Sequence, residues 1–241
     1  MPRSPAPRAT TTKPSGPPIG LIGAVVAFVV AVIAVLVYLA VRGDGLEATG
    51  SADTLPSGGG LVVNPDAPDD AVQVHVYEDF QCPFCGLLER SAGEGLFAAA
   101  DTGDIELTYT FMSFLDPVSD DQSSSRAANA ALCANDAGVF ADWHAAAFAA
   151  QPEEGIGYPD AALTGFAEQA GLAGEELDAF TTCVSEQTYA AYVTDMQEAA
   201  NQAGVSGTPT VEINGERLDN DELTRLQADP SSLTEIVEAN Q

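Results

Sequence analysis

The sequence predicts an α/β domain that follows a single N-terminal transmembrane helix. Two segments, residues 72–80 and 104–114, alternate apolar and polar side chains with the period of a β-strand. Between residues 123 and 203 the chain is rich in alanine, and its apolar residues recur with the spacing of helices. Residues 19–41 contain no charged side chain and are long enough to cross a hydrocarbon core of roughly 30 Å. These patterns divide the chain into an anchor, strands and a helical block.

The charges beside residues 19–41 predict how the helix is oriented in the membrane. Residues 1–18 contain three basic and no acidic residues, which predicts a cytoplasmic basic tail and places the rest of the chain outside. Tyr38 disfavours signal-peptide cleavage after Ala40, so we expect the helix to be retained. Cleavage near Ala48 or Ala52 is the alternative. The expected location is therefore the cell membrane, with a single pass and an extracytoplasmic domain.

The acidic residues are all on the extracytoplasmic side of the predicted helix. After residue 42 the chain has four basic and all 36 acidic residues, which leaves a formal charge of −32. Nucleic-acid binding requires a basic face, so this function is excluded. A high acidic load also keeps a domain soluble. The acidic residues do not have the spacing of a calcium-binding loop, and we expect no metal site.

Residues 42–70 are predicted to be a flexible linker, because they contain three prolines and three consecutive glycines. A short strand at residues 61–63 is the one regular element that we expect within it. The domain proper is expected at residues 71–241. These about 170 residues are enough for one domain with its own hydrophobic core.

The first predicted strand leads directly into the sequence Cys82-Pro83-Phe84-Cys85. We expect a helix over residues 82–100, weakened by three glycines, and then the second strand. After the helical block, Thr208-Pro209 precedes another strand-like run, in which Asn214-Gly215 predicts a two-residue hairpin. The C-terminal part adds helical turns at residues 221–226 and 231–239.

Four stripes of apolar residues predict about four helices in the block. The stripes are Phe140, Trp143 and Ala147; Leu163, Phe166 and Ala170; Leu177, Phe180 and Val184; and Tyr189, Val193, Met196 and Ala200. Such residues are usually core rather than ligand contacts. His75, alone within a strand, and His144, beside Trp143, are likewise expected to be structural or surface residues rather than catalysts.

The two residues between Cys82 and Cys85 allow these cysteines to close a small disulfide ring. A helix beginning there would direct its free N–H groups and positive dipole end at Cys82, which would then be a partly ionised nucleophile. Cys85, one turn inside the helix, would be shielded and would act as the resolving thiol. Half of a zinc site or a structural pair is the alternative. Zinc normally needs four nitrogen or sulfur ligands, and the remaining cysteines and both histidines are isolated in the sequence.

Two motifs give the chain a resemblance to a known family. D-F-x-C-P-x-C lies at residues 79–85 and G-V-x-G-T-P-T at residues 204–210. With both motifs at this separation, the chain resembles the membrane-anchored DsbA-like thiol:disulfide oxidoreductases of the thioredoxin superfamily over roughly residues 60–241. The resemblance implies a thioredoxin fold in which residues 120–203, approximately, are an α-helical insertion.

The resemblance also implies how the site is built. Pro209 would follow a cis peptide bond and pack against the dithiol, and Thr208 would offer backbone groups to an extended substrate strand. A cis bond is cheap only before proline, so this position is not freely replaceable. Pro83 and Phe84 complete the support of the site, and no cofactor is implied.

The sequence departs from the family pattern at two positions. Relatives often carry a buried acid six residues before the first cysteine, where this chain has Val76. Glu78 and Asp79 lie nearer, but the alternation of the strand does not decide whether either faces the dithiol, so the proton acceptor for Cys85 is not identified. Phe84 stands where strongly oxidising relatives have histidine, and we expect a moderately oxidising couple.

Cys133 and Cys183 lie on separate predicted helices of the block. Outside the cytoplasm an even number of cysteines favours pairing, so we predict a structural disulfide between them. Two free buried thiols are the alternative.

The function that these observations favour is oxidation of cysteine pairs in newly exported proteins. The resemblance implies reduced or misoxidised exported proteins as substrates, and a DsbB-like or VKOR-like membrane partner that reoxidises the dithiol. A reductase or isomerase supplied with electrons is the nearest alternative, although residues 41–71 contain no visible dimerisation module. A non-catalytic binding module and a copper-handling protein are further alternatives. The chain contains only three methionines, and this low number argues against copper handling.

Overall fold

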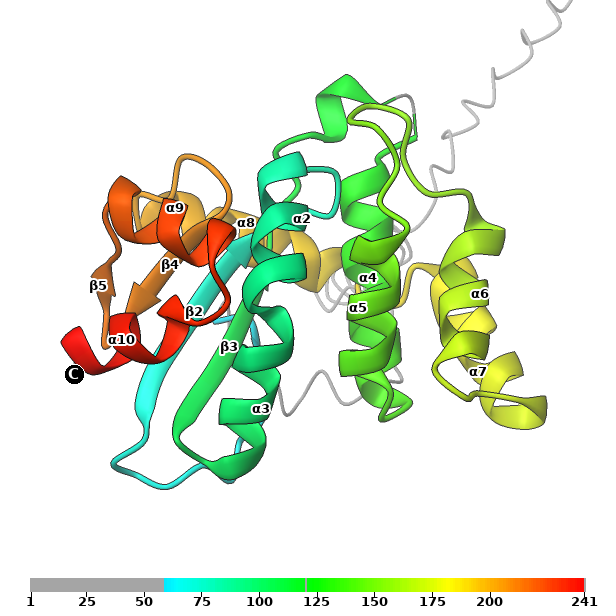
Figure 1. The fold of residues 1–241 in the computed structure, drawn as a ribbon. Helices are drawn as coiled ribbons and strands as arrows, with labels where there is room; N and C mark the ends of the chain where they lie inside the picture. The colour runs from blue at the N-terminus through cyan, green and yellow to red at the C-terminus, as the bar shows by residue number, and fades with distance from the viewer. Residues whose placement is uncertain (1–58, 120, 241) are drawn as a thin grey trace, which may run out of the picture. The chain divides into compact units, whose positions relative to one another are not determined.

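The computed structural model describes residues 59–119 and 121–240. The described residues form a five-stranded sheet with the order β1-β3-β2-β4-β5 (Figure 1). The strands are β1 (Leu61–Val62), β2 (Val72–Glu78), β3 (Ile105–Phe111), β4 (Thr210–Ile213) and β5 (Glu216–Arg217). The central pair, β2 and β3, is parallel, and every other pair is antiparallel. Both strands that the alternation predicted are therefore present, and they are the neighbours at the centre of the sheet.

Five α-helices separate β3 from β4 in the described part of the chain. They are α4 (Ser123–Asp136), α5 (Phe140–Ala149), α6 (Asp160–Gln169), α7 (Gly174–Glu186) and α8 (Ala190–Gln202). In Figure 1, α4 to α7 stand to one side of the sheet, and α8 crosses behind β3, opposite α3 (Glu94–Thr102). The predicted α/β class with a helical insertion is confirmed. The block contains one helix more than the four stripes predicted, because half of the buried residues of α4 are alanine, which forms no stripe of large residues.

The predicted helix over residues 82–100 consists of three segments. α2 (Pro83–Leu88) leads into a π-helical turn, η2 (Glu89–Gly93), and this turn leads into α3. A π turn is wider than an α turn and is found frequently at functional sites. At the other end of the chain, α9 (Asn220–Ala228) packs on α2 and η2, and α10 (Ser232–Ala239) follows it.

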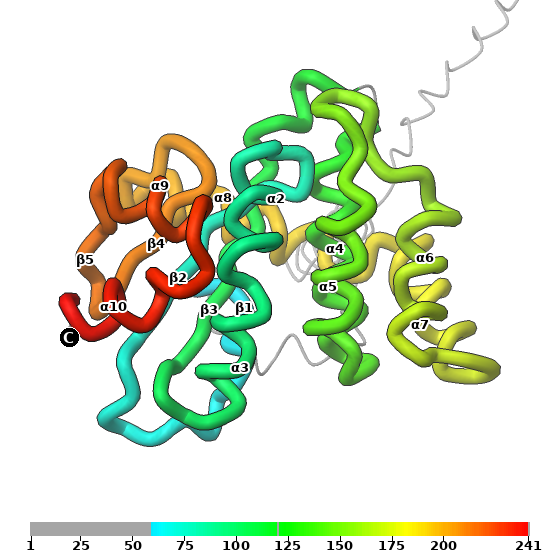
Figure 2. Tube along the Cα trace, viewed as in Figure 1, coloured from blue at the N-terminus to red at the C-terminus, as the bar shows by residue number. Residues whose placement is uncertain are grey.

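The predicted linker boundary at residue 70 is too late in the chain. β1 pairs with β3, and their labels stand side by side in Figure 2. The side chain of Asn64 fixes the segment after β1, because it donates to the carbonyls of Ala100 and Ile105 and accepts from the N–H of Leu107. The short strand expected at residues 61–63 is thus present as β1, and it belongs to the sheet of the domain.

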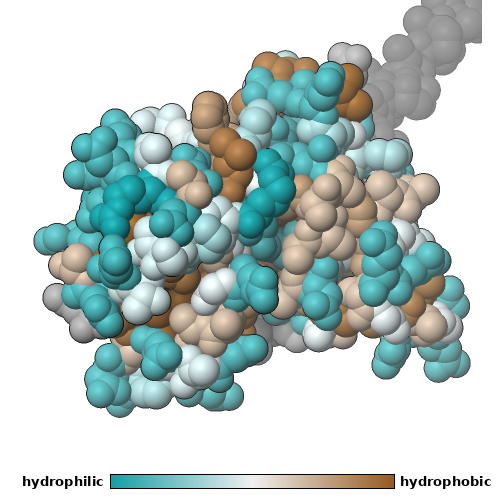
Figure 3. All heavy atoms as spheres, in the orientation of Figure 1, coloured by the Kyte–Doolittle hydropathy of each residue, from teal (hydrophilic) through white to brown (hydrophobic). Residues whose placement is uncertain are grey.

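The predicted basic tail (residues 1–18), the transmembrane helix (residues 19–41) and the first part of the linker lie outside the described residues. Among residues 59–119 and 121–240, no helix is both long and apolar enough to cross a membrane. The face drawn in Figure 3 is largely hydrophilic, with its apolar residues in separate groups.

Aromatic side chains join the insertion to the end of β2. The Phe80 ring stacks on Phe148 with 5.0 Å between centroids and meets Trp143 edge-on at 5.7 Å. Both partners lie on α5, whereas Phe80 lies two residues before Cys82. Aromatic pairs in these geometries stabilise a core beyond the effect of their buried area. The insertion therefore holds the segment that carries the two cysteines.

Candidate active site

Cys82 lies at the junction between β2 and α2, where the chain turns from strand to helix. Its N–H donates to the carbonyl of Asp79 at 2.9 Å, and Cys82 is the N-cap residue of α2. Pro83 opens the helix, a position where its missing N–H costs nothing. Both cysteines are free thiols, with Cys82 6% exposed and Cys85 fully buried. The structure is thus the dithiol form, with Cys82 as the outer sulfur.

The surroundings of Cys82 favour its thiolate. Its pKa is lowered to about 6, chiefly by a hydrogen bond with the Cys85 thiol, and then by Thr208 and the backbone N–H groups of Cys85 and Phe84. Burial acts in the opposite direction. At neutral pH the outer sulfur is therefore mostly ionised and nucleophilic.

Burial raises the pKa of Cys85 well above the ordinary range, and the Cys82 hydrogen bond, the Cys82 charge and the Glu78 charge add to this effect. The two sulfurs therefore differ strongly in acidity.

In reduced protein, alkylation by iodoacetamide should modify Cys82 alone, and its rate should rise with pH around a midpoint near 6. Cys82→Ser protein serves as the control and should not be modified at neutral pH. A midpoint near the value of a free cysteine, roughly 8.5, would contradict this account of the site.

The loop before β4 faces the dithiol. The peptide bond between Thr208 and Pro209 is cis, and Pro209 is buried. The Thr208 carbonyl accepts a hydrogen bond from the Cys82 thiol at 3.3 Å, across 126 residues of sequence. The two predicted motifs thus meet at one sulfur.

An exposed apolar surface lies beside Cys82 on α2. Phe84 is 60% exposed and Leu87 is 43% exposed. The carbonyl of Phe84 accepts from the side chain of Gln227 on α9 at 3.0 Å, so the start of α2 is held from both sides. Phe84 thus presents an uncharged aromatic ring to solvent.

Glu78 is the buried acid that the sequence did not locate. It is the last residue of β2, is almost fully buried, and its Oε1 lies 2.5 Å from Nε2 of His144. The other ring nitrogen of His144, Nδ1, lies 3.3 Å from Oε1 of Glu89 on η2. The sequence assigned His144 to the surface or to packing and did not single out Glu89. Only the fold brings β2, η2 and α5 together, and no spacing in the sequence signals this cluster.

Asp79 has a different role from that of Glu78. Its carboxylate accepts from the N–H groups of Gln81 and Leu115 and from the Ser124 hydroxyl, at 2.9, 3.0 and 2.6 Å. Burial raises its pKa to about 6, against these hydrogen bonds. With three donors already bound, the Asp79 carboxylate ties the active-site turn to the insertion.

Gln151 is a second contributor that the sequence missed. Its side-chain amide donates to the carbonyls of Phe80 and Cys82, both at 2.9 Å. Gln151 lies just after α5, so the insertion fixes both ends of the turn before α2. A single glutamine in a loop carries no sequence signal for this contact.

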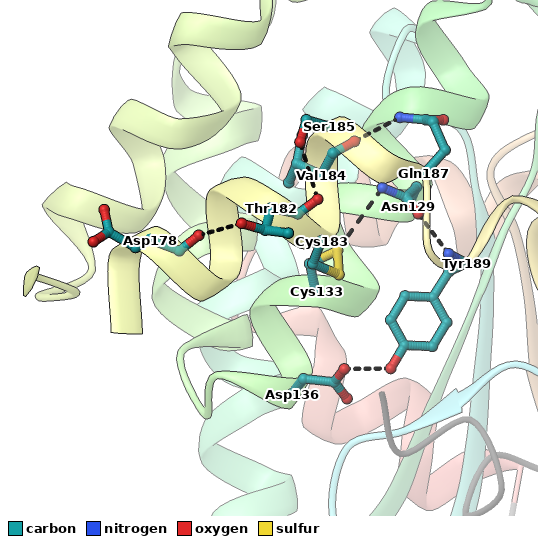
Figure 4. The surroundings of a disulfide bond; sticks show 10 residues. All are labelled: Asn129, Cys133, Asp136, Asp178, Thr182, Cys183, Val184, Ser185, Gln187 and Tyr189. Atoms are coloured by element: carbon teal, nitrogen blue, oxygen red, sulfur yellow. Dashed lines mark hydrogen bonds between the residues drawn. A yellow bond between two sulfur atoms is a disulfide. The ribbon is translucent and has the colours of Figure 1, made fainter. Parts of the chain in front are cut away.

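Cys133 and Cys183 form a disulfide bond that joins α4 to α7 (Figure 4). The amide of Asn129 donates to Cys133 Sγ, and its oxygen accepts from the N–H of Tyr189 at the start of α8. The Tyr189 hydroxyl in turn donates to Asp136. The disulfide thus belongs to the helical insertion and is separate from the dithiol.

Within residues 59–119 and 121–240, no group of three or more histidine, cysteine, aspartate or glutamate side chains is placed to hold a metal ion.

Comparison with protein families matches residues 62–229 to the family described as thioredoxin. Among curated proteins, the chain is 33% identical over 162 residues to the Na(+)/H(+) antiporter NhaA 1 of Salinispora arenicola. This match covers 64% of the chain and 23% of the antiporter, so the chain spans less than a quarter of that relative.

Two solved structures from Mycobacterium tuberculosis are similar in fold and sequence. The reduced disulfide bond oxidoreductase DsbG is 30% identical with a TM-score of 0.55, and the match covers 75% of this chain and 89% of DsbG. Reduced DsbA has the same identity and TM-score, over 75% of this chain and 95% of DsbA.

Proposed function

Given that this chain belongs to the thioredoxin family, we propose that it is an extracytoplasmic thiol:disulfide oxidoreductase that oxidises cysteine pairs in exported proteins. The redox centre is the pair Cys82 and Cys85. One observation carries the proposal: an outer thiol of lowered pKa caps a helix and touches the carbonyl before a cis proline. That arrangement suits a sulfur that attacks, and is attacked by, other sulfurs.

The reaction begins with the Cys82–Cys85 disulfide. A substrate thiolate attacks Cys82 Sγ, the bond to Cys85 breaks, and its electron pair leaves on Cys85, which takes up a proton. A second substrate thiolate then attacks the substrate sulfur of the mixed disulfide, and Cys82 leaves as a thiolate. The substrate is oxidised by two electrons and the enzyme reduced by two. Burial and the acidity of Cys82 favour these two products, a protonated Cys85 and an ionised Cys82.

A partner must then remove the two electrons. We propose a membrane protein with its own reactive disulfide, DsbB-like or VKOR-like, and a location of this chain at the cell membrane with its catalytic domain outside. The apolar run at residues 19–41 and the basic residues before it support this location. The antiporter relative supports it too, because there a similar region is part of a membrane transporter.

Disulfide transfer is tested directly with full-length oxidised protein and a peptide that contains two thiols. We expect one peptide disulfide per protein dithiol formed, counted by mass spectrometry after rapid alkylation. Copper(I) uptake without disulfide transfer would contradict the proposal and would favour a copper-handling module.

A reductase or isomerase supplied with electrons is the second candidate, and Phe84 is the observation that favours it. Neither of the two residues between the cysteines carries a charge, so neither offers the Cys82 thiolate a cation. A less stable thiolate makes a weaker oxidant.

Replacing Phe84 with histidine should therefore raise the reduction potential. An imidazolium beside Cys82 stabilises the thiolate, which exists only in the reduced form, and a gain of about 1.4 kcal/mol corresponds to about 30 mV. Equilibration with glutathione buffers measures the shift. Leu87→His, one turn further along α2, is the matched control and should change the potential less. No rise in Phe84→His would count against this account.

A further inference from the structure

Three ionisable side chains lie together inside an otherwise apolar part of the core. Glu78 and His144 are almost fully buried, and Glu89 is 9% exposed. Aromatic rings surround the imidazole, with centroids 4.8 to 5.8 Å away: Phe80, Phe97, Tyr109, Phe140 and Phe148. Burial of charge costs several kcal/mol per ion unless it is compensated, and replacing such groups by apolar ones is often stabilising. Packing alone therefore does not explain these three residues.

The inner end of the cluster, Glu78, lies close enough to the buried sulfur for its charge to raise the pKa of Cys85. Cys85 Sγ lies 3.5 Å from the backbone nitrogen of Asp79, the residue that follows Glu78. His144 then lies between two carboxylates: Nε2 is within hydrogen-bond distance of Glu78, and Nδ1, which makes no hydrogen bond in this structure, lies 3.3 Å from Oε1 of Glu89. An imidazole can take a proton at one nitrogen and release one from the other.

The far end of this cluster reaches solvent. Glu89 lines a groove of about 550 Å³ between η2–α3 and α5, and Phe148, which packs on His144, lines it as well. Its other polar walls are formed by Arg90, Glu94 and Asp142, among others. The buried imidazole is thus separated from the groove by a single carboxylate.

The π turn holds Glu89 in this position. Glu89 is the first residue of η2 and Gly93 the last. A Cβ atom at Gly93 would lie 2.2 to 2.4 Å from the carboxylate of Glu89, closer than any real contact. The backbone of Gly93 is ordinary right-handed helix, where alanine is normally preferred. Glycine at this position therefore serves to make room for the carboxylate.

We propose that Glu78, His144 and Glu89 are a proton relay between the Cys85 side of the dithiol and the groove between α3 and α5. The inference rests on the proposed redox function and adds the path of its proton. When a mixed disulfide at Cys82 is resolved, the S–H bond of Cys85 breaks and its proton passes to Glu78. His144, which the two carboxylates hold as the imidazolium, releases its Nδ1 proton to Glu89, which returns it to water, so that one proton enters the cluster and one leaves it. When the protein oxidises a substrate, a proton moves along the same path in the opposite direction, from the groove to Cys85.

Other titratable groups face the relay and set its environment. Burial and the charges of Glu89 and Glu78 raise the pKa of Tyr109 on β3. Burial and the charges of Glu78 and Asp79 raise the pKa of Tyr158 before α6, so neither phenol competes for the proton at neutral pH. Asp79 and Cys85 face Glu78 from the active-site turn and α2. Arg90 faces the groove, where its guanidinium donates to the carbonyl of Phe148 at 3.4 Å.

The test is the rate at which full-length protein with glutathione attached to Cys82 resolves by attack of Cys85. Glu89→Gln and His144→Gln should slow resolution about 10- to 100-fold at pH 7, and the rate should recover at high pH, where hydroxide deprotonates Cys85 directly. Gly93→Ala should do the same without changing any titratable residue, because it displaces Glu89. Gly165→Ala is its matched control, since a Cβ there meets no atom within 4 Å.

Wild-type rates and pH profiles in all three relay variants would overturn the relay. Failure of the wild-type protein to form or resolve the mixed disulfide would instead overturn the proposed redox function. Alkylation of Cys82 with the wild-type pH midpoint identifies the variants that fold. If none of the variants folds, the relay is tested in wild-type protein by the ¹⁵N resonances of His144, which is one of only two histidines in the chain. The relay predicts that they shift between the dithiol and disulfide forms, and identical titration in both forms would contradict it.

Discussion

Cys82→Ser should abolish disulfide transfer, and Cys85→Ser should stop it at a mixed disulfide. Cys82 is the outer sulfur and the ionised one, so no other thiol of the site can make the first attack. Cys85 is fully buried and acts only on a sulfur already bound to Cys82. We expect less than about one thousandth of wild-type turnover in both variants, since a residual rate of this order is typical when a nucleophile is lost.

The two variants are told apart with a peptide that contains a disulfide. Cys85→Ser protein should accumulate a covalent complex with one half of the peptide, visible by mass spectrometry without reductant. Cys82→Ser protein should form none. Transfer by Cys82→Ser protein at the wild-type rate would place the reactive sulfur elsewhere and contradict the assignment.

Removing the Cys133–Cys183 disulfide should have the largest effect on stability. The bond closes a loop with a sequence separation of 50 residues between α4 and α7. In the chain-entropy model such a loop contributes about 4 kcal/mol, a large part of the stability of a typical domain. The double variant Cys133→Ala with Cys183→Ala should lose about this much free energy of unfolding, measured by denaturant titration of the oxidised protein.

The matched control is the double variant Cys82→Ala with Cys85→Ala, which removes a pair that closes only a very short loop. Its stability should change much less than that of the helical-block variant. A loss below about 1 kcal/mol on removal of Cys133 and Cys183 would show that the disulfide adds little. Mass spectrometry that finds both cysteines alkylatable in non-reduced protein would contradict the pairing itself.

Local sequence patterns predicted the elements whose causes are local. The alternation at residues 72–80 gave β2 (Val72–Glu78) nearly to its ends. Asn214-Gly215 gave the β4–β5 hairpin because both residues take positive φ, 51° and 80°, as a two-residue turn between strands requires. The short strand at residues 61–63 was also predicted, but its place in the sheet was not, because it depends on the edge that β3 offers it.

The candidate site divides in the same way. The motifs around Cys82 and Pro209 are compact, and they identified the dithiol and the loop that faces it. Relatives often carry a buried acid at the position of Val76, and the sequence left open whether Glu78, two residues later, faces the interior; the fold buries it. Its partner His144 lies 66 residues away on the insertion. A pairing over that distance depends on how α5 packs against the sheet, which no spacing in a single sequence encodes.

The reduction potential of the Cys82–Cys85 pair tests the proposed function most directly. We would measure it in full-length protein in detergent, by equilibrium with glutathione buffers and quantitative alkylation. A disulfide donor of moderate strength predicts a value between about −120 and −180 mV, the range of oxidases and oxidising isomerases. A value near about −270 mV, as in thioredoxin, would contradict the oxidase and would assign the chain to reduction with a supply of electrons.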